Sequence, residues 1–364
     1  MKVLITGICG FVGSSIAREI RRAFPEWELA GIDNFSRAGS RLNQPVIEGE
    51  LGIQLVTGDI RFEKDIDALP KCDWVIDAAA IPSVLAGVDG KTTSRELIEH
   101  NLYGTINLLE YCKRNEAGFI LLSTSRVYSI MGLAGLEMEI EKDDNGVGRF
   151  APTQTQRFPY GISPRGVSEE YTTAPPVSLY GSTKVASEHL ALEYGETYGF
   201  PVWINRCGVM AGAGQFGHPA QGIFAYWIHS FREGRPLKYI GFGGNGHQVR
   251  DCLHPADLVR LLELQTREPA QTDKSRIVNT AGGLENSMSL AQLTNWCVKR
   301  YPDTRTVITS DSTKRPFDIP WMVLESTKVK CDWAWQPQTT IDSVCREIAD
   351  WADNNPNWLK LTIS

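Results

Sequence analysis

The sequence predicts an α/β protein that combines a doubly wound parallel sheet with a second, smaller α/β lobe. Short apolar runs rich in Val, Ile and Leu recur along the chain, and longer amphipathic stretches separate them. Strand, helix and strand repeated in this way give a parallel sheet with helices on both faces. A chain of 364 residues, 42% of them hydrophobic, is also long enough for two unequal lobes.

The predicted strands are the apolar runs at residues 2–6, 28–33, 54–57, 74–77, 119–123 and 202–205. Two long amphipathic helices are predicted at residues 94–114 and 180–198. Prolines and glycines crowd residues 131–177, so only short elements are expected there.

These elements predict two domains. The larger one is expected to consist of residues 1–205 and about 240–282, with the irregular insertion 131–177. The smaller lobe is expected to consist of residues 206–239 and 283–364, where turns rich in Gly and Pro separate shorter elements.

A glycine-rich turn, Gly7-x-x-Gly10-x-x-Gly13, joins the first strand to the first helix. Glycines let the backbone approach a pyrophosphate, which the N-terminus of the helix then faces. The second strand ends at Asp33, about 20 residues beyond the last glycine, where a carboxylate can accept hydrogen bonds from the adenosine ribose. This pattern predicts a Rossmann-type domain that binds NAD. The acid favours NAD over NADP, although Arg37 leaves the 2′-phosphate open, and a plain tight turn is the alternative.

Further cofactor contacts are expected where the chain leaves the strands of the parallel sheet, since ligands bind at the carboxyl ends of such strands. The predicted cofactor-binding residues are Gly7, Gly10, Phe11, Val12, Gly13, Asp33, Asn34, Asp59, Ile60, Ala78, Ala79, Ala80, Asn101, Ser123, Tyr180 and Lys184.

Three residues form the predicted catalytic group. Thr124 ends the fifth strand, and Tyr180 and Lys184 lie four residues apart, which places them on one face of a helix. A tyrosine has a pKa near 10 and is a poor base at neutral pH, but a fixed ammonium favours the phenolate. Lowering that pKa by about three units needs roughly 4 kcal/mol, which Lys184 and a nicotinamide ring together can supply. Tyr180 is the expected general acid and base, with Thr124 holding the reacting hydroxyl; an exposed helix face is the alternative.

Charge and cysteine content exclude several classes of protein. The net charge is −6 and no run of Lys or Arg occurs, which disfavours a surface for nucleic acid or for an anionic membrane. The eight cysteines lie far apart, without the spacing of a metal site, and are expected to be reduced thiols of a cytoplasmic protein. No metal is expected, and no apolar run is long enough to span a membrane.

This combination of motifs resembles the extended short-chain dehydrogenase/reductase family, also called the NAD-dependent epimerase/dehydratase family, from Met1 to about Trp335. The resemblance continues through residues 244–251 and 315–318, which are similar to the family's contacts with a nucleotide diphosphate. It implies that Arg250 and Arg315 face the phosphates and that Asp318 helps to hold the ribose of the nucleotide. Guanidinium groups suit phosphates, although an ordinary ion pair is the alternative for either arginine.

The stretch from Cys207 to Trp227 is similar to the CDP-paratose 2-epimerase (tyvelose epimerase) branch of the family. The family's dehydratases carry an Asp-Glu pair directly after the catalytic threonine, whereas Ser125 and Arg126 stand there in this chain. The resemblance therefore implies an epimerase for a nucleotide-activated sugar. The predicted substrate-binding residues are Ser125, Arg126, Gln215, Gln221, Gln248, Arg250, Arg315 and Asp318.

Several functions stay open at this stage. An epimerase would oxidise one carbon of the sugar and return the hydride to the opposite face, and inversion at carbon 2 or at carbon 4 would use the same residues. A net NAD(P)-dependent oxidoreductase and a redox-inert NAD-sensing protein are the alternatives. The resemblance also implies a homodimer that packs two long helices from each subunit.

Overall fold

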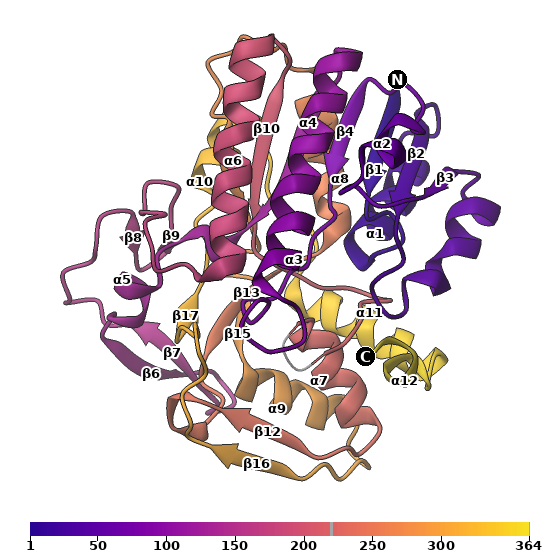
Figure 1. Ribbon diagram of the computed structural model, residues 1–364. Coiled ribbons are helices and arrows are strands. Elements are labelled where there is room, and N and C mark those ends of the chain that lie inside the picture. Colours follow the sequence, from indigo (N-terminus) through magenta and orange to yellow (C-terminus); the bar gives the residue numbers. More distant parts are fainter. Residues whose placement is uncertain (219–220, 364) are drawn as a thin grey trace.

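A computed structural model describes residues 1–218 and 221–363. Within them, seven parallel strands form a central sheet in the order β14-β10-β5-β4-β1-β2-β3 (Figure 1). The strand order changes direction between β1 and β4, which is where folds of this kind bind their ligands. The strands are β1 (Lys2–Thr6), β2 (Glu28–Asp33), β3 (Gln54–Thr57), β4 (Trp74–Asp77), β5 (Gly118–Thr124), β10 (Val202–Cys207) and β14 (Ile277–Thr280).

All six predicted strands are confirmed, with ends that differ by at most two residues. Their side chains are apolar on both faces because helices cover the sheet on both sides. Val3, Leu4 and Ile5 of β1, for example, are fully buried. The sequence analysis did not identify β14, a short strand whose last two residues, Asn279 and Thr280, are polar.

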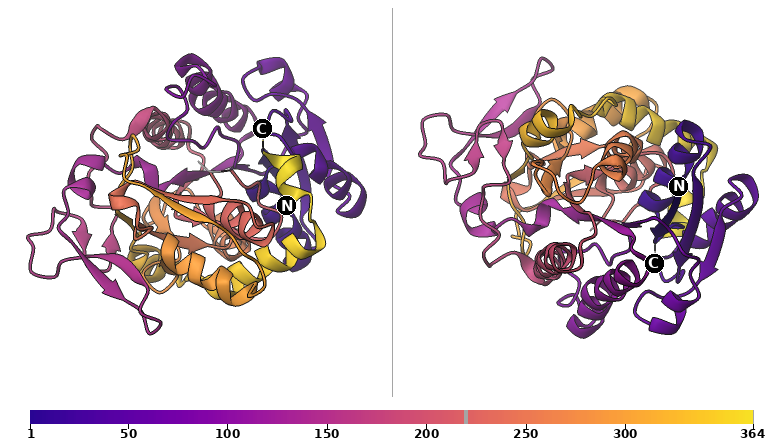
Figure 2. Two further views of the ribbon diagram at one scale, coloured as in Figure 1. Left: turned by 90° about the horizontal axis from the view of Figure 1, so that it is seen from below. Right: turned by 90° about the horizontal axis from the view of Figure 1, so that it is seen from above.

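Helices form a layer on each side of the central sheet (Figure 2). One layer packs its apolar residues with β1 and β10 and consists of α1 (Phe11–Ala23), α8 (Pro255–Arg267) and α10 (Thr327–Trp333). The opposite layer consists of α2 (Glu63–Asp67), α4 (Gly104–Asn115) and α6 (Ser178–Tyr198). This three-layer arrangement confirms the predicted doubly wound α/β fold.

The predicted helix at 94–114 contains a π-helical turn. It consists of α3 (Ser94–Ile98), the turn Glu99–Tyr103 and α4. Such turns are frequently found at functional sites. Here the turn carries Asn101, which is 2% exposed.

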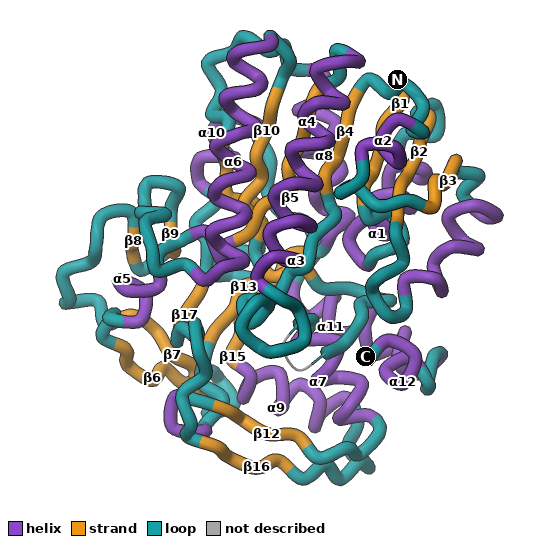
Figure 3. The backbone as a smooth tube through the Cα atoms, viewed as in Figure 1, coloured by secondary structure: helices purple, strands orange, loops and turns teal. Residues whose placement is uncertain are grey.

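The smaller lobe is built from short sheets below the central sheet in the view of Figure 3. One sheet joins β11, β13, β15 and β17, while β12 pairs with β16. Their bounds are β11 (Val209–Met210), β12 (Leu237–Ile240), β13 (Val249–Leu253), β15 (Ser287–Ser289), β16 (Ile308–Asp311) and β17 (Trp321–Met322). Its helices are α7 (Ile223–Arg232), α9 (Leu290–Arg300), α11 (Ile341–Asn354) and α12 (Trp358–Thr362).

Only short elements occur between 131 and 177, as predicted. They are the end of α5 (Ile130–Ala134), the hairpin β6 (Met138–Lys142) with β7 (Gly148–Pro152), and the pair β8 (Ile162–Ser163) with β9 (Gly166–Val167).

The division of the chain into two domains stays a proposal, which the strand pairing refines. β13 pairs with strands of the smaller lobe, so the segment that returns to the large domain begins with α8 rather than near residue 240. α10 lies within the predicted smaller lobe by sequence, but Val329 and Trp333 pack in the core of the large domain.

A substitution of Trp203 tests how much its packing against α10 stabilises the fold. Trp203 is fully buried on β10, its ring lies 4.9 Å from that of Trp333, and its indole N–H donates to the Gln265 carbonyl over 3.0 Å. We expect Trp203→Ala to lower the free energy of unfolding by about 3–5 kcal/mol, because it leaves a large cavity. Urea denaturation followed by circular dichroism measures this. Tyr160→Ala, at a side chain that is 81% exposed, should change it by less than about 0.5 kcal/mol. Equal effects would contradict the packing described.

Candidate active site

A single cavity of about 510 Å³ connects the carboxyl ends of the central strands with the smaller lobe. It brings together almost all of the predicted site residues, although they come from segments far apart in the sequence. Those that line it are Gly7, Gly10, Phe11, Val12, Gly13, Asp33, Asn34, Ile60, Ala78, Ala79, Ala80, Ser123, Thr124, Ser125, Arg126, Tyr180, Gln215, Gln221, Gln248, Arg250, Arg315 and Asp318.

The glycine turn forms one end of the cavity. Gly7 has a φ of +59°, and the Gly10 N–H donates to the Gly7 carbonyl over 2.9 Å. A Cβ atom on Gly13 would lie only 2.4 Å from the Gly7 oxygen, so a side chain there would force the turn open. No side chain of the described residues caps the first N–H groups of α1. These free donors at a helix N-terminus fit the pyrophosphate of NAD.

Asp33 stands at the end of β2 and is 8% exposed. Its carboxylate accepts hydrogen bonds from the backbone N–H groups of Cys9, over 2.9 Å, and Phe35, over 2.8 Å. Burial raises the pKa of Asp33, while these backbone donors favour the charged form. The carboxylate is thus held in place beside the glycine turn, as a contact with the adenosine ribose requires.

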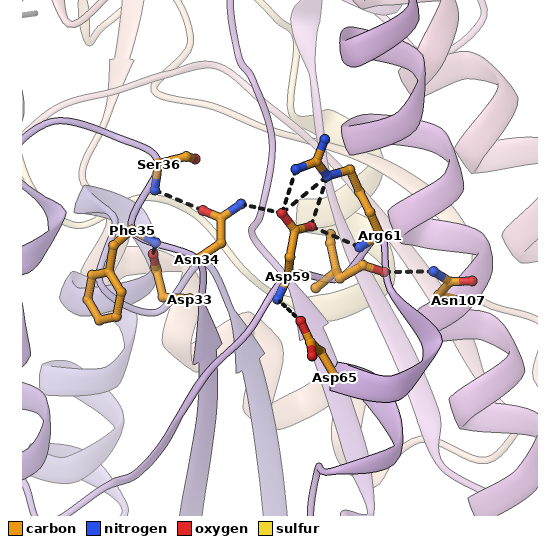
Figure 4. Close-up of polar contacts among 9 residues, drawn as sticks. Asp33, Asn34, Phe35, Ser36, Asp59, Arg61, Asp65 and Asn107 are labelled. Carbon is orange, nitrogen blue, oxygen red and sulfur yellow. Dashed lines mark hydrogen bonds and ion pairs between the residues drawn. The ribbon is translucent and has the colours of Figure 1, made fainter.

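Asp59 stabilises the loop that follows β3 through hydrogen bonds and an ion pair (Figure 4). It does not line the cavity. It accepts a hydrogen bond from Asn34 over 3.0 Å and forms an ion pair with Arg61 at 2.8 Å. Burial opposes ionisation, but the bonds from Arg61 and Asn34 bring the pKa of Asp59 down to about 2. Ile60 lines the cavity instead, and its carbonyl accepts from Asn107 over 2.8 Å. A contact between Asp59 and the cofactor therefore stays a prediction.

Tyr180 and Thr124 both line the cavity. Tyr180 lies in the first turn of α6 and is 6% exposed. Burial raises the pKa of Tyr180 to about 12, whereas Thr124 and the charge of Arg126 act to lower it. Arg126 is a cation that favours the phenolate. The effect of Lys184 on Tyr180 stays a prediction.

Lys184 lies behind the wall of the cavity, where two acids surround it. It is 2% exposed; burial lowers the pKa of its ammonium, while Asp77 and Glu188 raise it. Asn101 is also behind the wall, where its amide donates to Thr183 over 3.3 Å and accepts from the Ile81 N–H over 2.8 Å. Roles of Lys184 and Asn101 in cofactor binding stay predictions.

A buried ion pair fixes the same face of α6 to the central sheet. Glu188 and Arg206 are joined at 2.6 Å, and the Ser123 hydroxyl also donates to Glu188. Arg206 donates further to Tyr128 over 3.3 Å, and Tyr128 donates to Asn279 of β14 over 2.7 Å. This network links α6 with β5, β10 and β14 directly behind the predicted catalytic residues.

The end of the cavity opposite the glycine turn carries three guanidinium groups. Arg250 forms an ion pair with Asp318 at 2.8 Å, and Arg126 lies near the Phe317 carbonyl, at 3.5 Å. Burial and the charge of Arg250 lower the pKa of Arg126 to about 10. With Arg315, these groups concentrate positive charge that only Asp318 partly neutralises among the described lining residues, which suits a diphosphate.

Two glutamines offer unpaired acceptors to a ligand. The Gln215 amide nitrogen donates to the Met210 carbonyl over 2.6 Å, which fixes its side chain. The side-chain oxygens of Gln215 and Gln248 are buried and have no hydrogen-bond partner among the described residues. Both side chains line the cavity, so each oxygen can accept from a hydroxyl or amino group of a bound ligand.

Other lining residues were not assigned to the site from the sequence. They include His100, Phe216, Phe224 and Met288, and Cys207 at the end of β10 also lines the wall. The position of Cys207 at a strand end was a usable signal. The other four come from the π-helical turn and the smaller lobe, where no local pattern marks a side chain as facing a ligand. Arg37 also lines the cavity; this is the residue for which the sequence left open a contact with the 2′-phosphate of NADP.

Comparisons with known proteins agree with this site. A model of the NAD dependent epimerase/dehydratase family matches residues 3–281. CDP-paratose 2-epimerase of Salmonella typhi is 28% identical over 367 residues, covering 97% of this chain and 100% of that protein. The dTDP-glucose 4,6-dehydratase of Salmonella typhimurium is 25% identical over 374 residues, covering 99% and 94%. The structure of UDP-glucose 4-epimerase from Thermus thermophilus in complex with NAD gives a TM-score of 0.74 at 23% identity, covering 96% and 98%.

The family match spans the glycine turn, the strands and the Thr124–Tyr180 pair. The chain belongs to the NAD-dependent epimerase/dehydratase family. The predicted family, the enzymatic nature of the protein and its NAD cofactor are thereby confirmed. The fold of the solved structure confirms the Rossmann-type architecture.

The described part of the chain also bears on metal binding, membrane insertion and disulfide formation. No group of three or more His, Cys, Asp or Glu side chains there is arranged to hold a metal ion. No helix there has the length and apolar character needed to cross a membrane. All eight cysteines are unbridged, and every one except Cys331 is buried.

Gly13→Ala tests the phosphate-binding turn. The added methyl group would meet the Gly7 oxygen at 2.4 Å and the Ile8 Cα at 2.7 Å, so α1 must move away from the turn. We expect the purified variant to lose most of its bound NAD, measured by release on denaturation and enzymatic assay. Gly49→Ala is the control, because a Cβ atom there meets nothing within 4 Å. Wild-type NAD content in the Gly13 variant would contradict the role of this turn.

Arg126→Ala tests the cation beside Tyr180. Removing the charge should raise the pKa of Tyr180 further, so the rise of kcat with pH should shift to higher pH. At pH 7, kcat should fall about threefold for each half unit by which this pKa rises. The pH profile of kcat measures the shift, and Arg126→Lys should largely restore it because the charge is kept. An unchanged profile in the alanine variant would show that Arg126 does not act on Tyr180.

Proposed function

We propose that this enzyme is an NAD-dependent nucleotide-sugar epimerase similar to CDP-paratose 2-epimerase. The observation that carries the proposal is that Tyr180 and Thr124 line the same cavity as the glycine turn and the three arginines Arg126, Arg250 and Arg315. A nucleotide sugar whose diphosphate contacts Arg250 and Arg315 would place its sugar ring near this pair. The similarity to CDP-paratose 2-epimerase over nearly the whole chain supports the same reaction.

The roles of the side chains follow from their positions. NAD, when bound, supplies the acceptor for a hydride. Thr124 and Tyr180 would hold one hydroxyl of the sugar, and Tyr180 would take its proton during oxidation and return it during reduction. Arg126 would favour the charged form of Tyr180, and Lys184 would keep a buried positive charge one helical turn away. For epimerisation the sugar must present both of its faces, so the diphosphate would stay bound while the ring turns.

Ser125 and Arg126 support an epimerase rather than a dehydratase. Elimination of water needs an additional acid and base beside the catalytic threonine. A serine has no pKa near neutrality, and a guanidinium does not give up its proton under these conditions. The similar length and coverage of the dTDP-glucose 4,6-dehydratase therefore reflect the shared scaffold.

We also propose the predicted homodimer, with α4 and α6 as its contact surface. The two helices lie side by side on one face of the protein (Figure 1). Their segment exposes Tyr103 by 57% and Tyr198 by 48%, and Ile98 and Leu179 are also exposed. Sedimentation at low concentration that showed monomers alone would contradict this proposal. A cytoplasmic location likewise stays a prediction.

The reaction is tested with purified protein and CDP-, UDP-, GDP- and dTDP-sugars. Denaturation should release tightly held NAD, and product stereochemistry followed by NMR should show inversion at one carbon without net NADH. Inversion at carbon 2 of a CDP-deoxyhexose supports the proposal, whereas inversion at carbon 4 would make the enzyme a 4-epimerase. A stoichiometric change in added cofactor would show a net oxidoreductase, and binding without any turnover would show an NAD-sensing protein.

Tyr180→Phe tests the proposed base. The variant keeps the ring but loses the hydroxyl that transfers the proton, so we expect kcat to fall at least about 100-fold. NAD content should stay near that of the wild type. Tyr160→Phe, at an exposed position outside the cavity, should be fully active. Full activity of the Tyr180 variant would exclude this residue as the base.

A further inference from the structure

The C-terminal helix α12 lies between the two loops that carry the predicted ligand contacts. Figure 2 shows this end of the chain beside the N-terminal part of the large domain. Trp358, Leu359 and Thr362 of α12 are buried, although the helix has only five residues. The mechanism derived above uses none of these side chains, so their burial requires a separate explanation.

The first contact of α12 is with the loop 212–217 of the smaller lobe. The Trp358 indole N–H donates to the Gln215 carbonyl over 2.9 Å, and its ring lies 6.0 Å from the Phe216 ring. Leu359 packs so closely that a Cβ atom on Gly217 would lie 2.6 Å from its Cδ2 atom. The helix therefore covers this loop on the side that faces away from the cavity.

The opposite side of the same loop faces the ligands. Gln215 and Phe216 both line the cavity. Gln215 is 7% exposed, and its unpaired side-chain oxygen is available to a bound sugar or nucleotide. Trp358 binds the backbone carbonyl of Gln215 and thereby helps to hold the loop that carries this side chain.

The second contact of α12 is with the loop after β2, which carries residues expected near the adenosine end of NAD. A Cβ atom on Gly39 would lie 2.7 Å from the Thr362 Cγ2 atom and 3.3 Å from the Phe216 ring. Arg37 and Ser40, on either side of Gly39, line the cavity. Phe216 thus touches the cofactor loop and α12 at once.

α11 strengthens the attachment. The Ala213 N–H donates to the Glu347 carboxylate over 3.2 Å, and the Trp351 ring would lie 3.7 Å from a Cβ atom on Gly214. Trp351 also packs edge-on against Trp358, with ring centroids 5.2 Å apart. The loop is therefore fixed from outside by a continuous set of side chains that comes entirely from the last twenty or so residues.

We infer that Trp358 is a positioning residue that holds Gln215 and Phe216 in the cavity wall and so couples the binding of NAD with that of the nucleotide sugar. This inference rests on the proposed function for the identity of the sugar substrate, but its effect on NAD does not. Trp358 does not line the cavity, whereas Tyr180 and Thr124 do. Its loss should weaken binding of both ligands and leave the chemical step largely intact.

Trp358→Phe and Trp358→Ala separate the hydrogen bond from the packing. Removing the indole N–H alone should raise KM for the sugar about threefold to tenfold, the range expected for one hydrogen bond, with kcat within twofold of the wild type. The alanine variant should raise KM further and also speed the exchange of bound NAD against radiolabelled NAD. Leu361→Ala, at a side chain of the same helix that is 54% exposed, is the matched control and should change neither.

The outcomes distinguish this inference from the proposed function. If no tested sugar is converted by the wild type, the proposed function fails, while the NAD exchange rate still decides the role of Trp358. Wild-type NAD exchange and KM in the alanine variant would overturn the inference. If the alanine variant does not fold, the phenylalanine variant decides: an unchanged KM and NAD exchange rate overturn the inference, and a raised KM with unchanged kcat supports it. A fall in kcat alone would also overturn it.

Discussion

The buried ion pair between Glu188 and Arg206 holds together the elements that carry the reacting groups. Glu188 is fully buried on α6, Arg206 is 5% exposed on β10, and Ser123 of β5 donates to the same carboxylate. Separating two such charges would leave each one unpaired away from water, at a cost of about 3–5 kcal/mol. The pair thus fixes the angle of α6 against the strand that ends in Thr124. Since Tyr180 and Lys184 lie on this face of α6, their positions depend on it.

The two ends of the cavity would bind the phosphates of NAD and of the proposed substrate by different physical means. At the glycine turn, the hydrogen-bond donors are backbone N–H groups at a helix N-terminus. The charged side chain beside this turn is an acid, Asp33. At the other end, Arg126, Arg250 and Arg315 supply formal charge. A protein with a net charge of −6 can bind two anionic ligands in this way, because donors and guanidinium groups are concentrated where the phosphates lie.

Sequence reasoning succeeded where the signal is local. Strand positions follow from runs of apolar residues, and the turn at Gly7–Gly13 follows from sterics within one segment. It could not anticipate that Arg126 acts on Tyr180, or that Asp77 and Glu188 act on Lys184, because such contacts depend on how separate strands and helices pack. The bond between Trp358 and Gln215 joins residues 143 positions apart, and no local pattern marks either partner for the other.

The path of the chain between its two parts restricts how the molecule can move. The chain leaves the central sheet after β10, returns at α8, leaves again after β14 and comes back to pack α10 against the sheet. Several such crossings do not act as one hinge, since a wide rotation would strain each connection. Turnover limited by product release would be sensitive to the stiffness of the loops that line the cavity.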